Sequence, residues 1–207
     1  IRLGRRIYDN LQKAMGFILA VHIPIAGLAV LPLAFGAPPI LTPAIVAFLE
    51  MIIDPACSIL FEAEPEEHDV MRRPPRDPHA RLLHRELLLT SAAQGLLALL
   101  TVAVVYAIVY LEGRSVEDMR ALMLIAITAA NIALIFSHRA LTFSIEETFE
   151  RWNPWLWFGL AGVATVLTAT LAIPQAREIF RLGIAHANDL ALALAATLAL
   201  VALLLAF

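Results

Sequence analysis

The chain has 207 residues, of which 60% are hydrophobic and 16% are charged, and its mean hydropathy is +0.79. Soluble domains are typically about 45–50% apolar and about 25% charged, so this composition indicates a chain surrounded by lipid and excludes a disordered one. Cys57 is the only cysteine, which excludes a disulfide scaffold, and the net charge of −3 gives no reason to expect nucleic acid as a partner.

Apolar stretches recur along the chain at lengths close to the 20 or so residues that a helix needs to cross a bilayer. They predict an all-α membrane protein built as a bundle of six transmembrane helices. The second and fourth stretches are the shortest and contain polar residues. In chain order the predicted spans are residues 14–35, 44–61, 87–111, 121–137, 154–173 and 190–207.

The segments between the spans are polar or rich in proline. Residues 1–13 are predicted to form a basic amphipathic helix that runs directly into the first span, so we expect the chain to be part of a longer protein. Residues 36–43 are predicted to form a tight turn, and residues 62–86 a long charged loop. Residues 174–189 mix apolar and charged side chains, which indicates a segment at the membrane interface.

Lysine and arginine are distributed unevenly between the two sides of this predicted topology. Eleven of them lie on the side of the N-terminus and four on the other side. Because cytoplasmic segments carry the excess of positive charge, both ends of the chain are predicted to be cytoplasmic.

Three ionisable side chains lie inside predicted spans: His22 in the first, and Glu50 and Asp54 in the second. An ionisable group is costly within a membrane and marks a functional site by default. Glu50 and Asp54 are four residues apart, so they share one face of a helix. These three residues are therefore the candidate cation ligands.

Pro55 is predicted to break the second span, because proline donates no N–H and crowds the carbonyl of Met51. Pro24 is a second predicted helix break, in the first span. Broken helices occur within membranes where they line a cavity, and their free carbonyls can bind ions. Two carboxylates and the Met51 carbonyl would form an oxygen-rich site for a cation.

His22 and Asp54 lie at a similar predicted depth of ~10 Å, taking 1.5 Å per residue in antiparallel spans. Gln94 and Asn131 fall near the same level and are possible secondary ligands. Simpler interpretations stay open from the sequence. Glu50 could be hydrated near the interface, His22 could be a neutral histidine bound to a neighbouring helix, and the two amides could hold helices together.

The order of the motifs resembles a known family. The motifs are Gly4-Arg-Arg-Ile-Tyr-Asp-Asn-Leu-Gln-Lys13, Phe48-Leu-Glu-Met-Ile-Ile-Asp-Pro-Ala-Cys-Ser58, Phe61-Glu-Ala-Glu-Pro65, Asp69-Val-Met-Arg-Arg-Pro-Pro-Arg76 and Asn131-Ile-Ala-Leu-Ile-Phe-Ser-His-Arg139. This series resembles the C-terminal membrane domain of P-type cation-transporting ATPases, in the branch that includes the calcium pumps and bacterial members. The six spans would correspond to membrane helices five to ten of a ten-helix pump.

The resemblance implies that Asp54, in an unwound sixth helix, helps to bind the transported cation. Calcium pumps carry N-x-x-E in the fifth helix, where this chain has His22 and Ile25. They carry N-x-x-T-D in the sixth, where it has Glu50, Ile53 and Asp54. The cargo implied by these departures is another divalent cation or protons.

The resemblance also implies that four successive segments of the chain have different roles. It comprises a cytoplasmic stalk end (1–13), a first helical hairpin with the ion site (14–61), a cytoplasmic coupling loop (62–86) and a four-helix supporting bundle (87–207). The motifs DKTG, TGES and GDGxND are not in this sequence. ATP and Mg²⁺ would therefore act only through other domains of the pump, and this segment alone would not be an ATPase. The expected partners are membrane lipid and those other domains, in a bacterial inner membrane.

Two other functions are compatible with the spans themselves. One is a six-span secondary transporter or channel for a cation. The other is an intramembrane protease, which would need a serine–histidine or paired-aspartate constellation in facing spans. Ser58 and Ser91 have no evident base, and Asp54 has no intramembrane aspartate partner.

Overall fold

The computed structural model describes residues 1–74, 82–139 and 153–206, and for residues 54–58 the backbone alone. All regular structure in these ranges is helical, as the sequence predicts. The helices are α1 (Arg2–Ala34), α2 (Pro43–Glu62), α3 (Arg85–Leu111), α4 (Val116–His138), α6 (Pro154–Ala172), α7 (Pro174–Phe180) and α8 (Ala187–Ala206).

Five of the described helices, α1, α3, α4, α6 and α8, are long and apolar enough to cross a membrane, judged by length and composition. The chain is therefore a multi-pass membrane protein, and five of the predicted spans are confirmed. The second predicted span coincides with α2, which has 20 residues. Its apolar part with described side chains, Pro43–Ile53, is shorter than a span, so this crossing stays a prediction.

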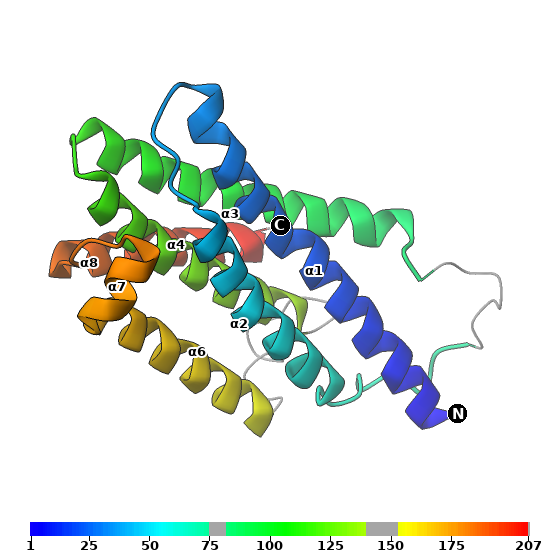
Figure 1. Cartoon of the computed structure of the whole chain (residues 1–207). Coiled ribbons are helices and arrows are strands. Elements are labelled where there is room, and N and C mark those ends of the chain that lie inside the picture. Colours follow the sequence, from blue (N-terminus) through cyan, green and yellow to red (C-terminus); the bar gives the residue numbers. More distant parts are fainter. Residues whose placement is uncertain (75–81, 140–152, 207) are drawn as a thin grey trace.

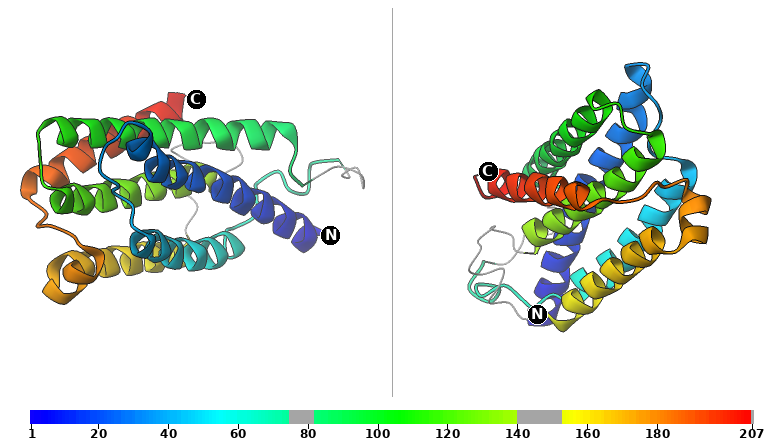
Figure 2. Two further views of the ribbon diagram at one scale, coloured as in Figure 1. Left: turned by 45° about the horizontal axis from the view of Figure 1, so that its top comes forward. Right: turned by 90° about the vertical axis from the view of Figure 1, so that its left-hand side faces the viewer.

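The helices pack around α4, which lies inside the bundle between α1, α3, α6 and α8 (Figures 1 and 2). Most of α4 is buried, whereas α6 and α8 expose most of their apolar side chains. A helix that is apolar all round and exposed is suited to lipid or to further membrane helices. α1 and α3 pack closely at Gly95, where a Cβ atom would lie 2.6 Å from the carbonyl oxygen of Ala20.

α1 is a single helix of 33 residues, so the basic N-terminal segment continues into the first span without interruption, as predicted. The breaks predicted at Pro24 and Pro55 are not present, because α1 continues through the first proline and α2 through the second. One proline removes a single backbone hydrogen bond and bends a helix, while the bonds on either side preserve it. The Met51 carbonyl therefore lies within a continuous helix, where Pro55 offers it no N–H.

The turn between α1 and α2 brings these helices side by side in antiparallel directions (Figure 1). Gly36 adopts a φ of +67°, which favours glycine, and Thr42 caps α2 by accepting a hydrogen bond from the Ile45 N–H over 3.3 Å. Near this turn, α7 packs on α2 through Phe180 and Phe48, whose ring centroids lie 5.0 Å apart. The predicted interfacial segment is thus helical in α7 and again from Ala187, where α8 begins.

Candidate cation site

His22 on α1 and Glu50 on α2 face each other, which agrees with the predicted pairing of these spans. The Nε2 atom of His22 lies 3.5 Å from Oε2 of Glu50, and the two side chains are 48% and 30% exposed. The other ring nitrogen, Nδ1, donates a hydrogen bond over 2.7 Å to the carbonyl oxygen of Ile18. Because a carbonyl can only accept, Nδ1 carries the proton and Nε2 is the atom presented to the carboxylate.

The bond to Ile18 holds the imidazole in one orientation and one tautomer. Metal-binding histidines are commonly held in this way, with one nitrogen on a backbone carbonyl and the other free for the ligand. The separation of 3.5 Å between His22 and Glu50 exceeds the 2.7–3.2 Å usual for an N–H···O hydrogen bond. The His22–Glu50 pair can therefore bind a cation or share a proton.

Asp54 lies one helical turn beyond Glu50 on α2, so its backbone position is on the same face of the helix. Its side chain lies outside the described residues, as do those of Pro55 and Cys57. Among the side chains that are described, no three from His, Cys, Asp and Glu are grouped closely enough to hold a metal ion. The described part of the candidate site thus consists of two side chains, those of His22 and Glu50.

The two possible secondary ligands occupy different settings. The side-chain amide of Gln94 on α3 donates to the Ser137 hydroxyl of α4 over 2.9 Å, which is a contact between helices. Asn131 on α4 is 5% exposed and lines a cavity of about 20 Å³ together with Thr128 and apolar side chains of α1, α2 and α6. Its Oδ1 has no hydrogen-bond partner among the described atoms. A role for either amide in cation binding stays a prediction.

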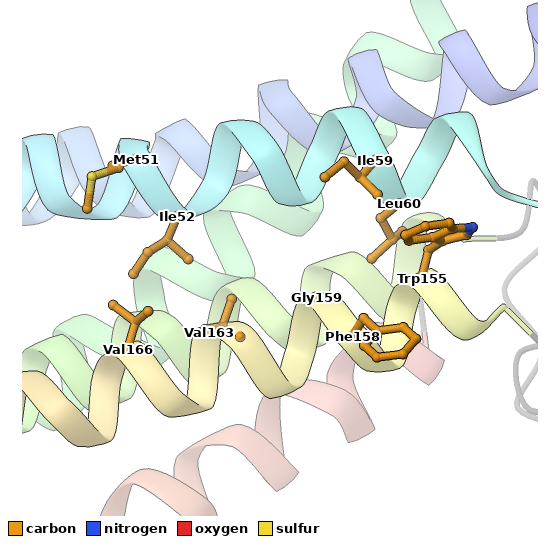
Figure 3. A pocket seen from close by; sticks show the side chains of 10 residues that line it. Met51, Ile52, Ile59, Leu60, Trp155, Phe158, Gly159, Val163 and Val166 are labelled. Atoms are coloured by element: carbon orange, nitrogen blue, oxygen red, sulfur yellow. The ribbon is translucent and has the colours of Figure 1, made fainter.

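A larger groove of about 350 Å³ lies between α2 and α6 (Figure 3). Ile52 of α2 points toward Val163 and Val166 of α6 across it. The described side chains that line it are apolar, apart from the indole N–H of a tryptophan, and none of them carries an oxygen.

A buried polar cluster that the sequence analysis did not single out lies at the end of the bundle where α1 begins. The carboxylate of Glu64 is fully buried and accepts from the Arg139 guanidinium over 3.2 Å and from the Asn153 amide over 2.8 Å. The backbone carbonyl of Glu64 accepts from the Asn10 side chain over 2.8 Å. This Glu64 cluster (Asn10, Glu64, Arg139 and Asn153) joins α1 to the segments that follow α2 and α4 and precede α6.

Further ion pairs join the first turns of α1 to the loop after α2. Lys13 Nζ lies 2.6 Å from Glu67 Oε1, and both side chains are almost fully buried. Asp9 pairs with Arg73 over 2.8 Å, and Arg5 donates to two loop carbonyls over 2.7 Å each. The opposite charges of residues 2–13 and 62–69 could have indicated this contact from the sequence.

Comparison with known proteins adds evidence of a different kind. The sequence model of the family described as "Cation transporting ATPase, C-terminus" matches residues 38–207. A protein of Mycobacterium tuberculosis called "Probable cation-transporting ATPase F" is 26% identical over 178 residues, covering 86% of this chain and 20% of the relative; the Mycobacterium bovis protein matches equally. "Calcium-transporting ATPase 1" of Saccharomyces cerevisiae is 29% identical over 96 residues, or 45% of this chain and 10% of the relative. The chain spans about a fifth of the length of the mycobacterial relatives.

Proposed function

This chain belongs to the family of cation-transporting ATPase C-terminal domains, and on that basis we propose that it works within an ATP-driven pump whose cation is bound by His22 and Glu50. Family membership favours the pump over a secondary transporter or channel. The observation that supports the site most directly is the 3.5 Å approach of an imidazole and a carboxylate from two neighbouring helices. Asp54, one turn further along α2, would complete the set of ligands.

The continuity of α1 supports a route by which movement reaches this site. Lys13, Asp9 and Asn10 join the start of α1 to the loop after α2. His22 follows Lys13 by nine residues on the same helix, or about 13 Å at 1.5 Å per residue. A tilt or shift of α1 would therefore change the position of His22 relative to Glu50.

The rest of the proposal concerns the pump as a whole. ATP and Mg²⁺ would bind to its other domains, and the end of the bundle that carries the Glu64 cluster would face the cytoplasm, where those domains act. Lipid or further helices of the same pump would cover the exposed apolar faces of α6 and α8. The bacterial cell membrane is the proposed location.

The test is ion-dependent phosphorylation of the full-length pump by ATP. We expect Glu50→Gln and Asp54→Asn to abolish the dependence on the transported ion, because each removes a charged ligand. Glu62→Gln is the matched control, since Glu62 is an exposed carboxylate on the same helix. Unchanged ion dependence in both site variants would overturn the site assignment.

A further inference from the structure

The chemistry of the His22–Glu50 pair also bears on which cation is carried, provided that the pair binds the cargo as proposed above. We propose that the site selects a divalent transition-metal ion that accepts imidazole, with Zn²⁺ as the representative, over Ca²⁺. The pair supplies one imidazole nitrogen and one carboxylate oxygen. Imidazole suits zinc, copper, iron and nickel, whereas calcium takes six to eight oxygens.

The first supporting observation is the anchoring of the histidine. The Nδ1–H of His22 is bonded to the Ile18 carbonyl over 2.7 Å, so Nε2 is the ring nitrogen that faces Glu50. A bound metal ion satisfies both atoms at once, and the anchored ring loses little freedom on binding it.

The second observation is the distance between the two ligand atoms. Zinc binds imidazole nitrogen and carboxylate oxygen at about 2.0–2.2 Å, so two ligands at a tetrahedral angle are about 3.4 Å apart. The observed separation of Nε2 and Oε2 is 3.5 Å. The pair can therefore bind such an ion with almost no movement of α1 against α2.

The third observation is that the described side chains one turn beyond the pair carry no oxygen. Ile25 lies three residues after His22 and Ile53 three residues after Glu50, and both are buried among apolar side chains. Neither helix is unwound here, and the only ladder carbonyls that Pro24 and Pro55 leave without a donor are those of Ala20 and Met51. Calcium would need several further oxygens, whereas a tetrahedral ion needs two more ligands, of which Asp54 could provide one and water the other.

The experiment is a binding titration of the purified full-length pump with ZnCl₂ and, separately, with CaCl₂. We expect zinc to bind and calcium to bind weakly or not at all. His22→Asn, which exchanges the nitrogen ligand for an amide oxygen, should weaken zinc binding by about 100-fold or more and reduce the preference for zinc over calcium. His68→Asn is the matched control, because His68 is exposed in the loop after α2.

The possible outcomes separate this inference from the proposed function. Calcium binding tighter than zinc, or zinc binding unchanged by His22→Asn, would overturn the choice of metal while Glu50→Gln could still abolish transport. A pump whose phosphorylation responds to pH alone and to no metal ion would also overturn it. Phosphorylation independent of Glu50 and Asp54 would instead overturn the proposed site itself. Since His22 is about half exposed, its replacement leaves the packing intact.

Discussion

The molecule contains two sets of ionisable side chains that differ in how completely they are paired. In the Glu64 cluster the carboxylate is fully buried and accepts from an arginine and an amide. In the His22–Glu50 pair both side chains are partly exposed and stand 3.5 Å apart. A buried charge is tolerated when hydrogen bonds and an opposite charge satisfy it, whereas two ionisable side chains that do not fully satisfy each other can bind an ion. The first arrangement therefore holds the fold together, and the second suits a site that must bind and release.

The largest effect is expected for Glu64→Ala in the Glu64 cluster. Removal of this carboxylate takes one anionic partner from the Arg139 guanidinium, which is 2% exposed. Breaking a buried ion pair in this way costs about 3–5 kcal/mol. We expect the free energy of unfolding of the purified protein in detergent to fall by that amount, while Glu62→Ala, at an exposed position on α2, changes it by less than about 0.5 kcal/mol. Equal effects of the two variants would show that the cluster does not stabilise the fold.

A somewhat smaller loss is expected for Lys13→Met, which breaks the buried pair with Glu67. The loss should be about 3 kcal/mol, because Glu67 stays buried while the methionine preserves part of the packing. A double-mutant cycle with Glu67→Gln measures the interaction directly. A coupling energy near zero would contradict a direct pairing between the start of α1 and the loop.

Most of the fold could be predicted from the sequence, because lipid imposes a simple rule on helix length. Six apolar stretches predicted the positions of α1, α2, α3, α4, α6 and α8, with ends displaced by a few residues except where α1 continues into the stalk. The helix breaks were predicted wrongly, since the local rule for proline does not count the hydrogen bonds that surround it. The short α7 and its contact with Phe48 depend on packing that no local pattern encodes.

The His22–Glu50 pair and the Glu64 cluster also differ in how far the sequence could predict them. His22 and Glu50 could be identified because an ionisable residue in an apolar span is conspicuous, and the structure places them face to face. Glu64 could not, because it stands among other acidic residues of a charged segment. Its burial depends on Arg139 and Asn153, which are 75 and 89 residues away in the sequence. Only the folded chain brings these three together.

Zinc itself provides a test at the His22–Glu50 pair. A ligand that binds only the folded state at 100 times its Kd raises the free energy of unfolding by about 2.7 kcal/mol. We expect ZnCl₂ to produce this stabilisation in the wild-type protein and not in Glu50→Gln, whose stability without metal should be close to wild type because Glu50 is partly exposed. Thermal unfolding in detergent with and without zinc measures both. Equal stabilisation of both proteins by zinc would place the metal elsewhere.

The smallest effect is expected at Arg2 and Glu66, an exposed ion pair that joins the start of α1 to the loop. The hydrogen bond from Arg2 holds the pKa of Glu66 below its ordinary value of 4.5. A lowered pKa in the folded state stabilises the protein above the unfolded pKa, and this stabilisation is lost as the pH falls through the folded pKa. Glu66→Gln should therefore lower the Tm slightly at pH 7 and leave it unchanged well below pH 4.5. At pH 7, 0.5 M salt should remove the difference in Tm between the variant and the wild type, because salt screens exposed charges. The buried Lys13–Glu67 pair should keep most of its contribution in the same salt, since water and ions do not reach it. A Glu66 effect that survives salt would mean that this pair, although exposed, stabilises the stalk as the buried pairs do.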